Sequence, residues 1–232
     1  MKRFAVIPAG GSGKRFGSDT PKQFLKIAGK EIILYTLEPF LRCEKIDEII
    51  VAVSESYLEF ADNLFEQYRK IKPIKVVEGG KERQDSVFAA LSFIKNAEPT
   101  DFIAVHDAAR ALLSKDVLEQ ALLDAARRGS AVVSIPARDT LAIAEAERVI
   151  DYANRSMIYY VQTPQIFQYG VLMNALRKAK EENFLGTDES SVVKKYGGDV
   201  FLSEGSPLNF KITHKEDLQL AEIILLSLNN EN

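Results

Sequence analysis

Hydrophobic residues in this chain follow two patterns that alternate along its length. Short runs rich in β-branched residues are typical of buried strands, and longer stretches with apolar residues every three or four positions are typical of amphipathic helices. The strand-like runs are residues 4–7, 48–53, 74–77, 102–105 and 131–135. Strands that alternate with helices in this way predict an α/β protein with a mostly parallel, doubly wound sheet.

Two of the helical stretches have recognisable ends. Residues 115–128 carry apolar side chains at helical spacing, and Gly129 follows, a residue type common just past a helix C-terminus. The last stretch opens with Thr213, and Glu216 three residues later predicts a capping box. The apolar positions that predict a packing face on this last helix are Leu218, Leu220, Ile223 and Leu225.

The alternation breaks between Pro136 and Thr163. Short apolar runs separated by charged residues predict a hairpin-like arm at 137–160, although 144–148 also fit a helical turn. Apolar residues on a protruding arm need a cover, and a second copy of the chain is the simplest one. We therefore expect a single domain, 1–232, that forms a homodimer through this arm.

Composition and charge narrow the class of protein. The chain has 232 residues, of which 46% are hydrophobic, enough for one large core. A net charge of −3 argues against general binding to nucleic acid or to an anionic membrane. Cys43 is the single cysteine, and no apolar stretch after Met1 is long enough for a signal peptide or a membrane-spanning helix. These features predict a cytoplasmic protein.

The first predicted strand runs into a glycine-rich loop that carries cations. Residues 8–17 read Pro-Ala-Gly-Gly-Ser-Gly-Lys-Arg-Phe-Gly. Such glycines can present consecutive N–H groups to an anion, and Lys14, Arg15 and Lys22 add charge, so the pattern predicts a polyphosphate site. A P-loop is excluded because Pro8 stands at its first glycine and Arg15 at its hydroxyl residue. The glycine spacing also departs by one residue from the dinucleotide fingerprint. A flexible turn with exposed lysines remains the alternative.

Polar residues also follow the third and fourth predicted strands. Residues 78–86 contain a glycine pair before a helix and can frame a base or a phosphate, although an ordinary turn explains them equally well. Asp107 follows a buried strand and can bind Mg²⁺ or a substrate hydroxyl, and Arg110 can bind a second anion. A structural salt bridge is the alternative for this pair. His106 fits a hydrogen-bonded framework residue better than a catalytic base.

Several short motifs occur along the chain in a fixed order. They are residues 8–15, 21–23, 79–86, 106–110, 138–140, 155–156, 162–165, 187–189 and 209–213. With this ordered set the chain closely resembles the 2-C-methyl-D-erythritol 4-phosphate cytidylyltransferase family, CTP-using enzymes of the non-mevalonate isoprenoid pathway. The resemblance implies a Rossmann-like nucleotidyltransferase fold with a dimerising arm. It also implies a reaction in which a substrate phosphate attacks the α-phosphorus of CTP and expels pyrophosphate, with no covalent enzyme intermediate.

The same resemblance implies roles for individual residues. Stabilisation of the reacting phosphates is implied for Arg15, Lys22 and Lys211. Contacts to the cytidine end are implied for Ala9, Gly10, Gly11, Gly13, Gly80 and Ser86. Binding of the phosphorylated polyol is implied for Asp107 and Arg110, and for Thr140, Arg155 and Thr163 from the arm of the second subunit. Mg²⁺ is the implied cofactor, with Asp107 as its only protein ligand because Leu208 stands where some members carry a further carboxylate.

Other activities remain open at this level. Ribitol-5-phosphate cytidylyltransferases resemble the chain through the same loop and the 162–165 motif, whereas the motifs at 155–156 and 187–191 favour the methylerythritol enzyme. A sugar-1-phosphate nucleotidyltransferase is a more distant alternative, for which the chain is short. A non-catalytic nucleotide-binding protein on the same sheet is a third alternative. The cations Arg15, Lys22 and Lys211 argue against it, because a binding protein needs no charge at each point around a transferring phosphoryl group.

Overall fold

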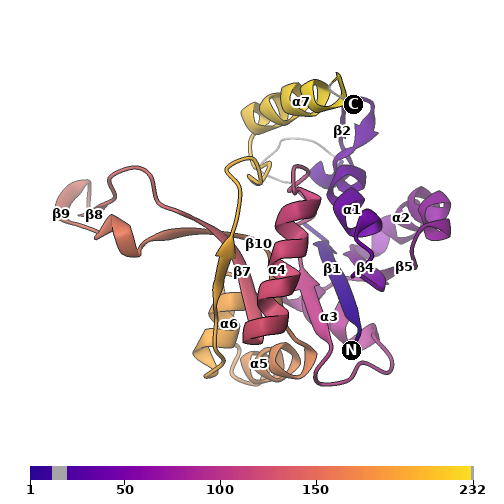
Figure 1. Ribbon diagram of the computed structural model, residues 1–232, viewed down its shortest axis with the longest axis horizontal. Coiled ribbons are helices and arrows are strands. Elements are labelled where there is room, and N and C mark those ends of the chain that lie inside the picture. The colour runs from indigo at the N-terminus through magenta and orange to yellow at the C-terminus, as the bar shows by residue number, and fades with distance from the viewer. Residues whose placement is uncertain (12–19, 231–232) are drawn as a thin grey trace.

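A seven-stranded sheet forms the centre of the protein (Figure 1). The computed structural model describes residues 1–11 and 20–230. The strands of the sheet are β1 (Arg3–Ala9), β4 (Glu48–Val53), β5 (Ile74–Glu78), β6 (Phe102–Val105), β7 (Ser130–Pro136), β10 (Tyr159–Gln168) and β11 (Leu202–Glu204). Their order is β11-β7-β10-β6-β1-β4-β5, and β10 alone runs antiparallel to its neighbours. The prediction of a mostly parallel sheet is confirmed.

Helices cover both faces of this sheet. Those that pack on one face are α1 (Ile32–Arg42), α2 (Leu58–Phe65) and α4 (Lys115–Arg128). Those on the other face are α3 (Arg83–Phe93), α5 (Tyr169–Glu181) and α6 (Glu189–Lys195). Strand β1 is buried on both faces: Ala5 and Ile7 belong to one core, and Phe4 and Val6 to the other. This double burial explains why its sequence is a continuous apolar run and confirms the doubly wound prediction.

The last helix packs away from the main sheet. Helix α7 (Lys215–Asn230) lies beside the short hairpin of β2 (Lys26–Ile27) and β3 (Lys30–Glu31), where a third, smaller core forms. The prediction that α7 packs through Leu220 and Ile223 is wrong, because these side chains are 50% and 63% exposed. The predicted packing of Leu218 and Leu225 is confirmed: both lie on the face that packs into this core together with Ala221, and the helical period turns the other two residues to the outside.

The predicted capping box at the start of this helix is also wrong. Helix α7 begins at Lys215, and its first turn is closed by Asp217. The carboxylate of Asp217 accepts the backbone N–H groups of Thr213 and His214 at 2.8 Å each. The Thr213 hydroxyl donates instead to the carbonyl oxygen of Lys211 at 3.1 Å. The shorter acidic side chain one residue after Glu216 therefore caps the helix.

The predicted arm is a hairpin that projects from the body of the protein (Figure 1). Strands β8 (Ala142–Glu145) and β9 (Arg148–Tyr152) pair antiparallel with each other in a sheet of their own. Ala146 and Glu147 between them have φ values of 45° and 68°, the conformation of a tight hairpin turn, so the alternative of a helical turn is not the one formed. The large apolar residues exposed on this hairpin are Ile143, Val149, Ile150 and Tyr152.

Strand β10 was not predicted as part of the main sheet. Tyr159 and Tyr160, placed at the end of the arm by the sequence, are its first residues and pair with β7. Its pairing with β7 shifts register between Val161 and Gln165, and the Thr163–Pro164 peptide bond within that interval is cis. The short 3₁₀ helices are η2 (Lys22–Phe24), η3 (Glu55–Tyr57), η4 (Glu66–Lys70) and η5 (Arg155–Met157). Within 1–11 and 20–230, no helix is both long and apolar enough to cross a membrane.

Candidate active site

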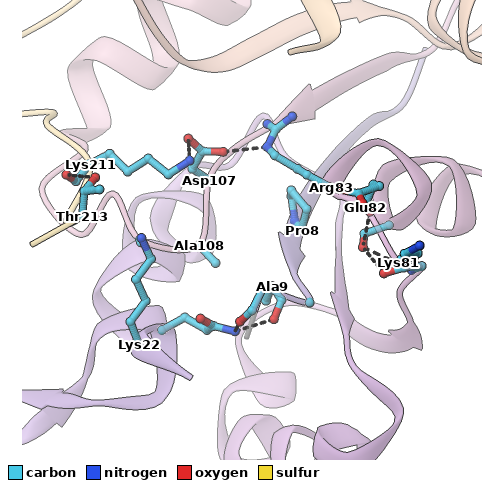
Figure 2. Close-up of a pocket in the computed structure, with 16 residues that line it drawn as sticks. Pro8, Ala9, Lys22, Lys81, Glu82, Arg83, Asp107, Ala108, Lys211 and Thr213 are labelled. Atoms are coloured by element: carbon cyan, nitrogen blue, oxygen red, sulfur yellow. Dashed lines mark hydrogen bonds and ion pairs between the residues drawn. The ribbon is translucent and has the colours of Figure 1, made fainter. Parts of the chain in front are cut away.

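A cavity of about 510 Å³ opens at the carboxyl ends of β1 and β6 (Figure 2). Ligands of open α/β sheets bind at this edge because loops and helix N-termini converge there. Its walls come from the end of β1, from η2, from the turns into α3 and after β6, and from the segment before α7. The predicted site residues that line it are Ala9, Gly10, Gly11, Lys22, Gly80, Ser86, Asp107 and Lys211.

One side of the cavity is built from closely packed backbone. A Cβ atom on Gly80 would lie 2.2 Å from the Asp85 Cβ, and one on Gly10 would lie 3.2 Å from the Ser86 Oγ. The Ser86 hydroxyl accepts the N–H of Gly80 at 3.2 Å and donates to the carbonyl oxygen of Glu82 at 3.1 Å. Glycines at these positions therefore let two loops approach until their backbone groups form the wall.

Gln23 fixes the start of the glycine-rich loop on the same wall. It is buried, and its Nε2 donates to the carbonyl oxygens of Ala9 at 2.5 Å and Gly11 at 3.2 Å. Because these bonds come from η2, they set the spacing between the end of β1 and Lys22. A side chain amide thus joins the backbone wall to the first of the cavity's lysines.

The other side of the cavity carries the cations. The Lys22 Nζ donates to the carbonyl oxygen of Ile212 at 2.7 Å, and Ile212 in turn donates its N–H to the carbonyl oxygen of Ala109 at 2.8 Å. Lys211, next to this anchor, extends its ammonium toward Asp107 (Figure 2). Two lysines from opposite ends of the chain therefore line one cavity.

Asp107 lies at the centre of this cationic side, in contact with three cations. Arg83 Nε donates to its Oδ1 at 2.9 Å, Lys211 Nζ lies 3.1 Å from Oδ2, and Arg110 Nε donates to Oδ2 at 3.3 Å. Figure 2 shows Arg83 and Lys211 reaching the carboxylate from opposite sides. Burial by itself raises the pKa of Asp107, but the charges of these three cations outweigh burial and hold the pKa far below its ordinary value. Asp107 is therefore an anion that orients the cations around it.

Arg110 and Thr163 lie behind Asp107 and not on the cavity wall. The Asp107 N–H donates to the Thr163 Oγ1 at 3.1 Å, and Arg110 Nη1 donates to the carbonyl oxygen of Asn209 at 2.7 Å. Asn209 is fully buried, and its Nδ2 donates to the carbonyl oxygen of Thr163 at 2.8 Å. In this structure the two predicted substrate contacts hold the turn that presents Asp107.

His106 is a framework residue, as expected. Its ring is fully buried, which lowers its pKa to about 4 because burial disfavours the charged imidazolium. Nε2 lies 3.3 Å from the carbonyl oxygen of Arg110, which only accepts, so Nε2 carries the proton. Nδ1 then accepts the hydroxyl proton of Thr163 at 2.9 Å. The neutral ring joins the two ends of the 106–110 turn.

The donor set does not fit a Mg²⁺ ion held by the protein. In the described part of the chain, no three His, Cys, Asp or Glu side chains are placed to share a metal ion. Asp107, the predicted ligand, already has cations at both carboxylate oxygens. A metal at Asp107 would have to displace these cations or lie beside them, at a Coulombic cost.

Two predicted site residues, Gly13 and Arg15, fall outside the described residues, and two others lie away from the cavity. Thr140 and Arg155 are exposed near the base of the arm, and they do not line the cavity of their own chain. Arg155 Nη1 donates to the carbonyl oxygen of Arg138 at 2.8 Å.

Two residues that contact the predicted site residues, Arg83 and Gln23, were given no role from the sequence. Arg83 contacts both Asp107 and Glu189, and Gln23 holds the glycine-rich loop. A cation at the first position of a helix that follows a glycine pair is a signal for Arg83, since it is unfavourable there without an acidic partner. No local signal identifies Gln23.

Comparisons with known proteins agree with one another. The family described as 2-C-methyl-D-erythritol 4-phosphate cytidylyltransferase matches residues 4–227. The protein of that name from Clostridium botulinum (strain Langeland) is 40% identical over 228 residues, which cover 98% of this chain and 99% of the relative. One from Clostridium perfringens (strain SM101) is 39% identical over 222 residues, with 95% and 97% covered. The crystal structure of the Francisella tularensis protein of that name superposes with a TM-score of 0.82 at 30% identity, over 95% of this chain and 98% of that one.

The fold and these relatives define the chain as an enzyme of the nucleotidyltransferase class. The mostly parallel sheet, the helices on both of its faces and the cavity at the carboxyl ends of its strands are those expected for that class. Within the class, the chain belongs to the 2-C-methyl-D-erythritol 4-phosphate cytidylyltransferase family. The resemblance found in the sequence is confirmed.

Proposed function

We propose that this enzyme transfers the cytidylyl group of CTP to 2-C-methyl-D-erythritol 4-phosphate, giving CDP-methylerythritol and pyrophosphate for isoprenoid precursor synthesis. The observation that carries the proposal is a single cavity with a backbone wall on one side and cations around Asp107 on the other. Such a cavity offers hydrogen bonds to a base and positive charge to phosphates. Membership of the family supports the identity of both substrates.

The backbone wall is the proposed site of the cytidine. Its groups, from residues 9–11 and from Gly80, are fixed by Gln23 and Ser86, so they can present donors and acceptors to a base edge without reordering. Ala9, Gly10, Gly11, Gly80 and Ser86 fill this role, together with Gly13 from the loop. Because the wall is backbone, the placement of these groups depends on the close approach of the two loops that Gly10 and Gly80 allow.

The lysines are the proposed catalytic residues. An oxygen of the acceptor phosphate forms a bond to the α-phosphorus, and the bond from that phosphorus to the bridging oxygen breaks, so pyrophosphate leaves with the electron pair. The acceptor oxygen is already ionised, and no general base is required. Lys22 and Lys211, with Arg15, neutralise the charge that builds up on the equatorial and leaving oxygens and hold the reacting groups in line.

The acceptor site is proposed to be shared between two subunits. Asp107, with Arg110 and Thr163 behind it, forms the part contributed by one chain. Thr140 and Arg155 from the second chain's arm complete it, and Arg155 can hold the acceptor phosphate by two parallel hydrogen bonds. The exposed apolar residues of the arm support a homodimer. A sedimentation coefficient of a monomer at all concentrations in analytical ultracentrifugation would rule this assembly out.

We propose that a divalent cation, Mg²⁺, enters with CTP and is bound by phosphate oxygens. This follows from the engagement of Asp107 by three cations and from the preference of Mg²⁺ for phosphate oxygens and water. A reducing cytoplasm is the proposed location of the reaction, since Cys43 is a buried free thiol.

The test is pyrophosphate release in the presence of Mg²⁺ and CTP, with 2-C-methyl-D-erythritol 4-phosphate and D-ribitol 5-phosphate as parallel acceptors. Release with the first alone, with CDP-methylerythritol detected by mass, is expected. Release with ribitol 5-phosphate alone would overturn the pathway and keep the mechanism. CTP binding without turnover on either acceptor would indicate a non-catalytic binding protein.

A further inference from the structure

Arg83 lies between two buried carboxylates. Its Nη1 donates to both oxygens of Glu189, at 2.7 and 2.9 Å, while its Nε donates to Asp107 at 2.9 Å. Its Nη2 is buried and has no hydrogen-bond partner among the described residues. The orientation of the guanidinium is therefore set by two acidic side chains, one of which lies on the cavity wall and the other outside it.

The position of Glu189 is fixed by contacts of its own segment. Glu189 is the first residue of α6, and Asp188 before it caps the helix by accepting the Ser191 N–H at 2.8 Å. Gln165 of β10 holds the same turn from the sheet: its Nε2 donates to Asp188 Oδ2 and its Oε1 accepts the Ser190 N–H, both at 2.8 Å. These three polar contacts leave Glu189 little freedom to follow Arg83 if Arg83 moves.

Burial makes the pairing of Glu189 with Arg83 obligatory. The Glu189 side chain is 1% exposed, and the cation that contacts it in the described part of the chain is Arg83. A buried carboxylate without a counter-charge is strongly disfavoured. Movement of Arg83 away from Glu189 would leave such a carboxylate, so Glu189 favours the orientation in which Arg83 contacts it. Glu189 does not line this cavity but a smaller one that shares Glu82 and Arg83 with it, and Arg83 is the side chain that contacts both Glu189 and Asp107.

We propose that Glu189 is a positioning residue for cytidylyl transfer. It holds Arg83 so that Arg83 keeps the Asp107 carboxylate turned toward Lys211 and Arg110 at the acceptor end of the cavity. This inference rests on the proposed function for its kinetic readout. Asp107 contacts Lys211 and Arg110, Arg83 orients Asp107, and Glu189 orients Arg83.

The simpler explanation is that the Glu189–Arg83 pair only joins α6 to α3. Gln84, the next residue of α3, already makes two such joining contacts: its Nε2 donates to the carbonyl oxygen of Phe184 at 3.0 Å, and its Oε1 accepts the Gly186 N–H at 2.9 Å. Neither Phe184 nor Gly186 belongs to the cluster of side chains around Asp107. Gln84→Ala is therefore a matched control that weakens the same junction without changing the charges around Asp107.

The test is a double-mutant cycle of Glu189→Gln and Arg83→Gln, read by steady-state kinetics and thermal unfolding. Glu189→Gln is expected to raise the KM for the acceptor roughly tenfold, less than the ~10²-fold cost of a 1 Å misplacement, with the KM for CTP within about twofold of wild type. Glu189→Asp restores a carboxylate and is expected to recover part of this loss. In the Arg83→Gln background, Glu189→Gln is expected to cause no further kinetic loss, because the residue through which it acts is gone.

Two results would overturn the proposal. One is a Glu189→Gln enzyme that, like Gln84→Ala, loses thermal stability while both KM values and kcat stay at wild-type levels. The other is additive kinetic loss in the double variant. Wild-type turnover is measured first, and its absence with every acceptor would count against the proposed function only. In that case the crystal structure of the Glu189→Gln variant decides: Arg83 turned away from Asp107 is expected, and an unchanged contact contradicts the inference.

Discussion

The cavity wall and the arm hold their side chains in opposite ways. In the wall, Gln23 and Asp107 are buried and bonded to segments distant in the sequence. On the arm, Ile150 and Tyr152 are more than half exposed, and the strands that carry them pair only with each other. One chain therefore fixes the groups proposed to bind CTP, whereas the proposed arm residues of the acceptor site are exposed, with Arg155 held in that chain by its bond to the carbonyl oxygen of Arg138.

This difference indicates a division of labour between recognition of the nucleotide and recognition of the acceptor. Groups that one fold locks in place need no partner to be aligned. Thr140 and Arg155 are exposed near the arm and would become aligned only against another surface. Substitutions in the wall are thus expected to act within one subunit, and substitutions near the arm across two.

The largest effect is expected for Lys22→Met. Loss of a cation that meets the reacting phosphates should lower kcat by about 10²–10³-fold, the usual cost of removing one preorganised group from a charged transition state. The control is Lys26→Met, since Lys26 lies four residues away with a 65% exposed side chain paired to Glu31. A loss of kcat of less than tenfold in Lys22→Met, with the control unchanged, would show that Lys22 does not stabilise the charge of the reacting phosphates.

Mixed dimers test the division between subunits directly. Arg15→Ala and Arg155→Ala are each expected to be nearly inactive alone, because every shared site lacks one cation. Random mixing at equal amounts should restore about a quarter of wild-type activity, since half of the dimers are mixed and each has one intact site. Turnover after dissociation and reassociation is the measurement. No recovery, with mixed dimers demonstrated by differential tagging, would place both residues in the same subunit's site.

A smaller effect concerns the stability of the folded protein as pH falls, through the buried His106 in the turn that presents Asp107. The pKa of His106 is about 4 in the folded protein, below its ordinary value of 6.5, so between these pH values the unfolded chain takes up a proton that the folded chain excludes. The free energy of unfolding should therefore fall by about 3 kcal/mol as pH drops from 6.5 to 4. Denaturant titrations at several pH values should show this fall in the free energy of unfolding for wild type and a smaller fall for His106→Gln. An NMR titration that gives His106 a pKa near 6.5 would contradict it.

The smallest effects are expected for exposed apolar residues, and here the arm can be compared with α7. Leu220→Gln, on the exposed face of α7, should change the free energy of unfolding by no more than about 0.5 kcal/mol and leave the oligomeric state unchanged. Ile150→Gln, equally exposed on the arm, should shift the dimer toward monomer in sedimentation velocity. If both substitutions weaken the dimer, α7 belongs to the interface as well.

Much of the fold could be predicted from periodicity, and the exceptions have physical reasons. Buried parallel strands are continuous apolar runs, so β1, β4 and β6 were predicted close to their observed bounds. Strand β10 was assigned to the arm at its start because its first residues are exposed and its pairing with β7 is irregular. The cap of α7 was misplaced because Asp217 competes successfully with Glu216 for the same N–H groups.

The site was predicted only as far as local motifs extend. Glycine loops and strand ends identified Gly80, Asp107 and Lys22, which line one cavity. The contact between Arg83 and Glu189 joins residues 106 positions apart, and no local sequence pattern predicts such a pairing. Thr163 was expected to touch the substrate from the arm of the second subunit, whereas its buried hydroxyl bonds to Asp107 and His106 of its own chain, 56 and 57 positions away, a contact that no local motif indicates.

The bond between Lys22 and the carbonyl oxygen of Ile212 spans 190 positions of the chain. During synthesis on the ribosome, the glycine-rich loop and the first six strands can emerge long before this acceptor is translated. A nascent chain therefore cannot seat Lys22 in its final geometry until residue 212 has left the exit tunnel. A product that ends just before residue 211 contains every strand of the sheet, yet it lacks both Lys211 and the carbonyl oxygen that Lys22 contacts.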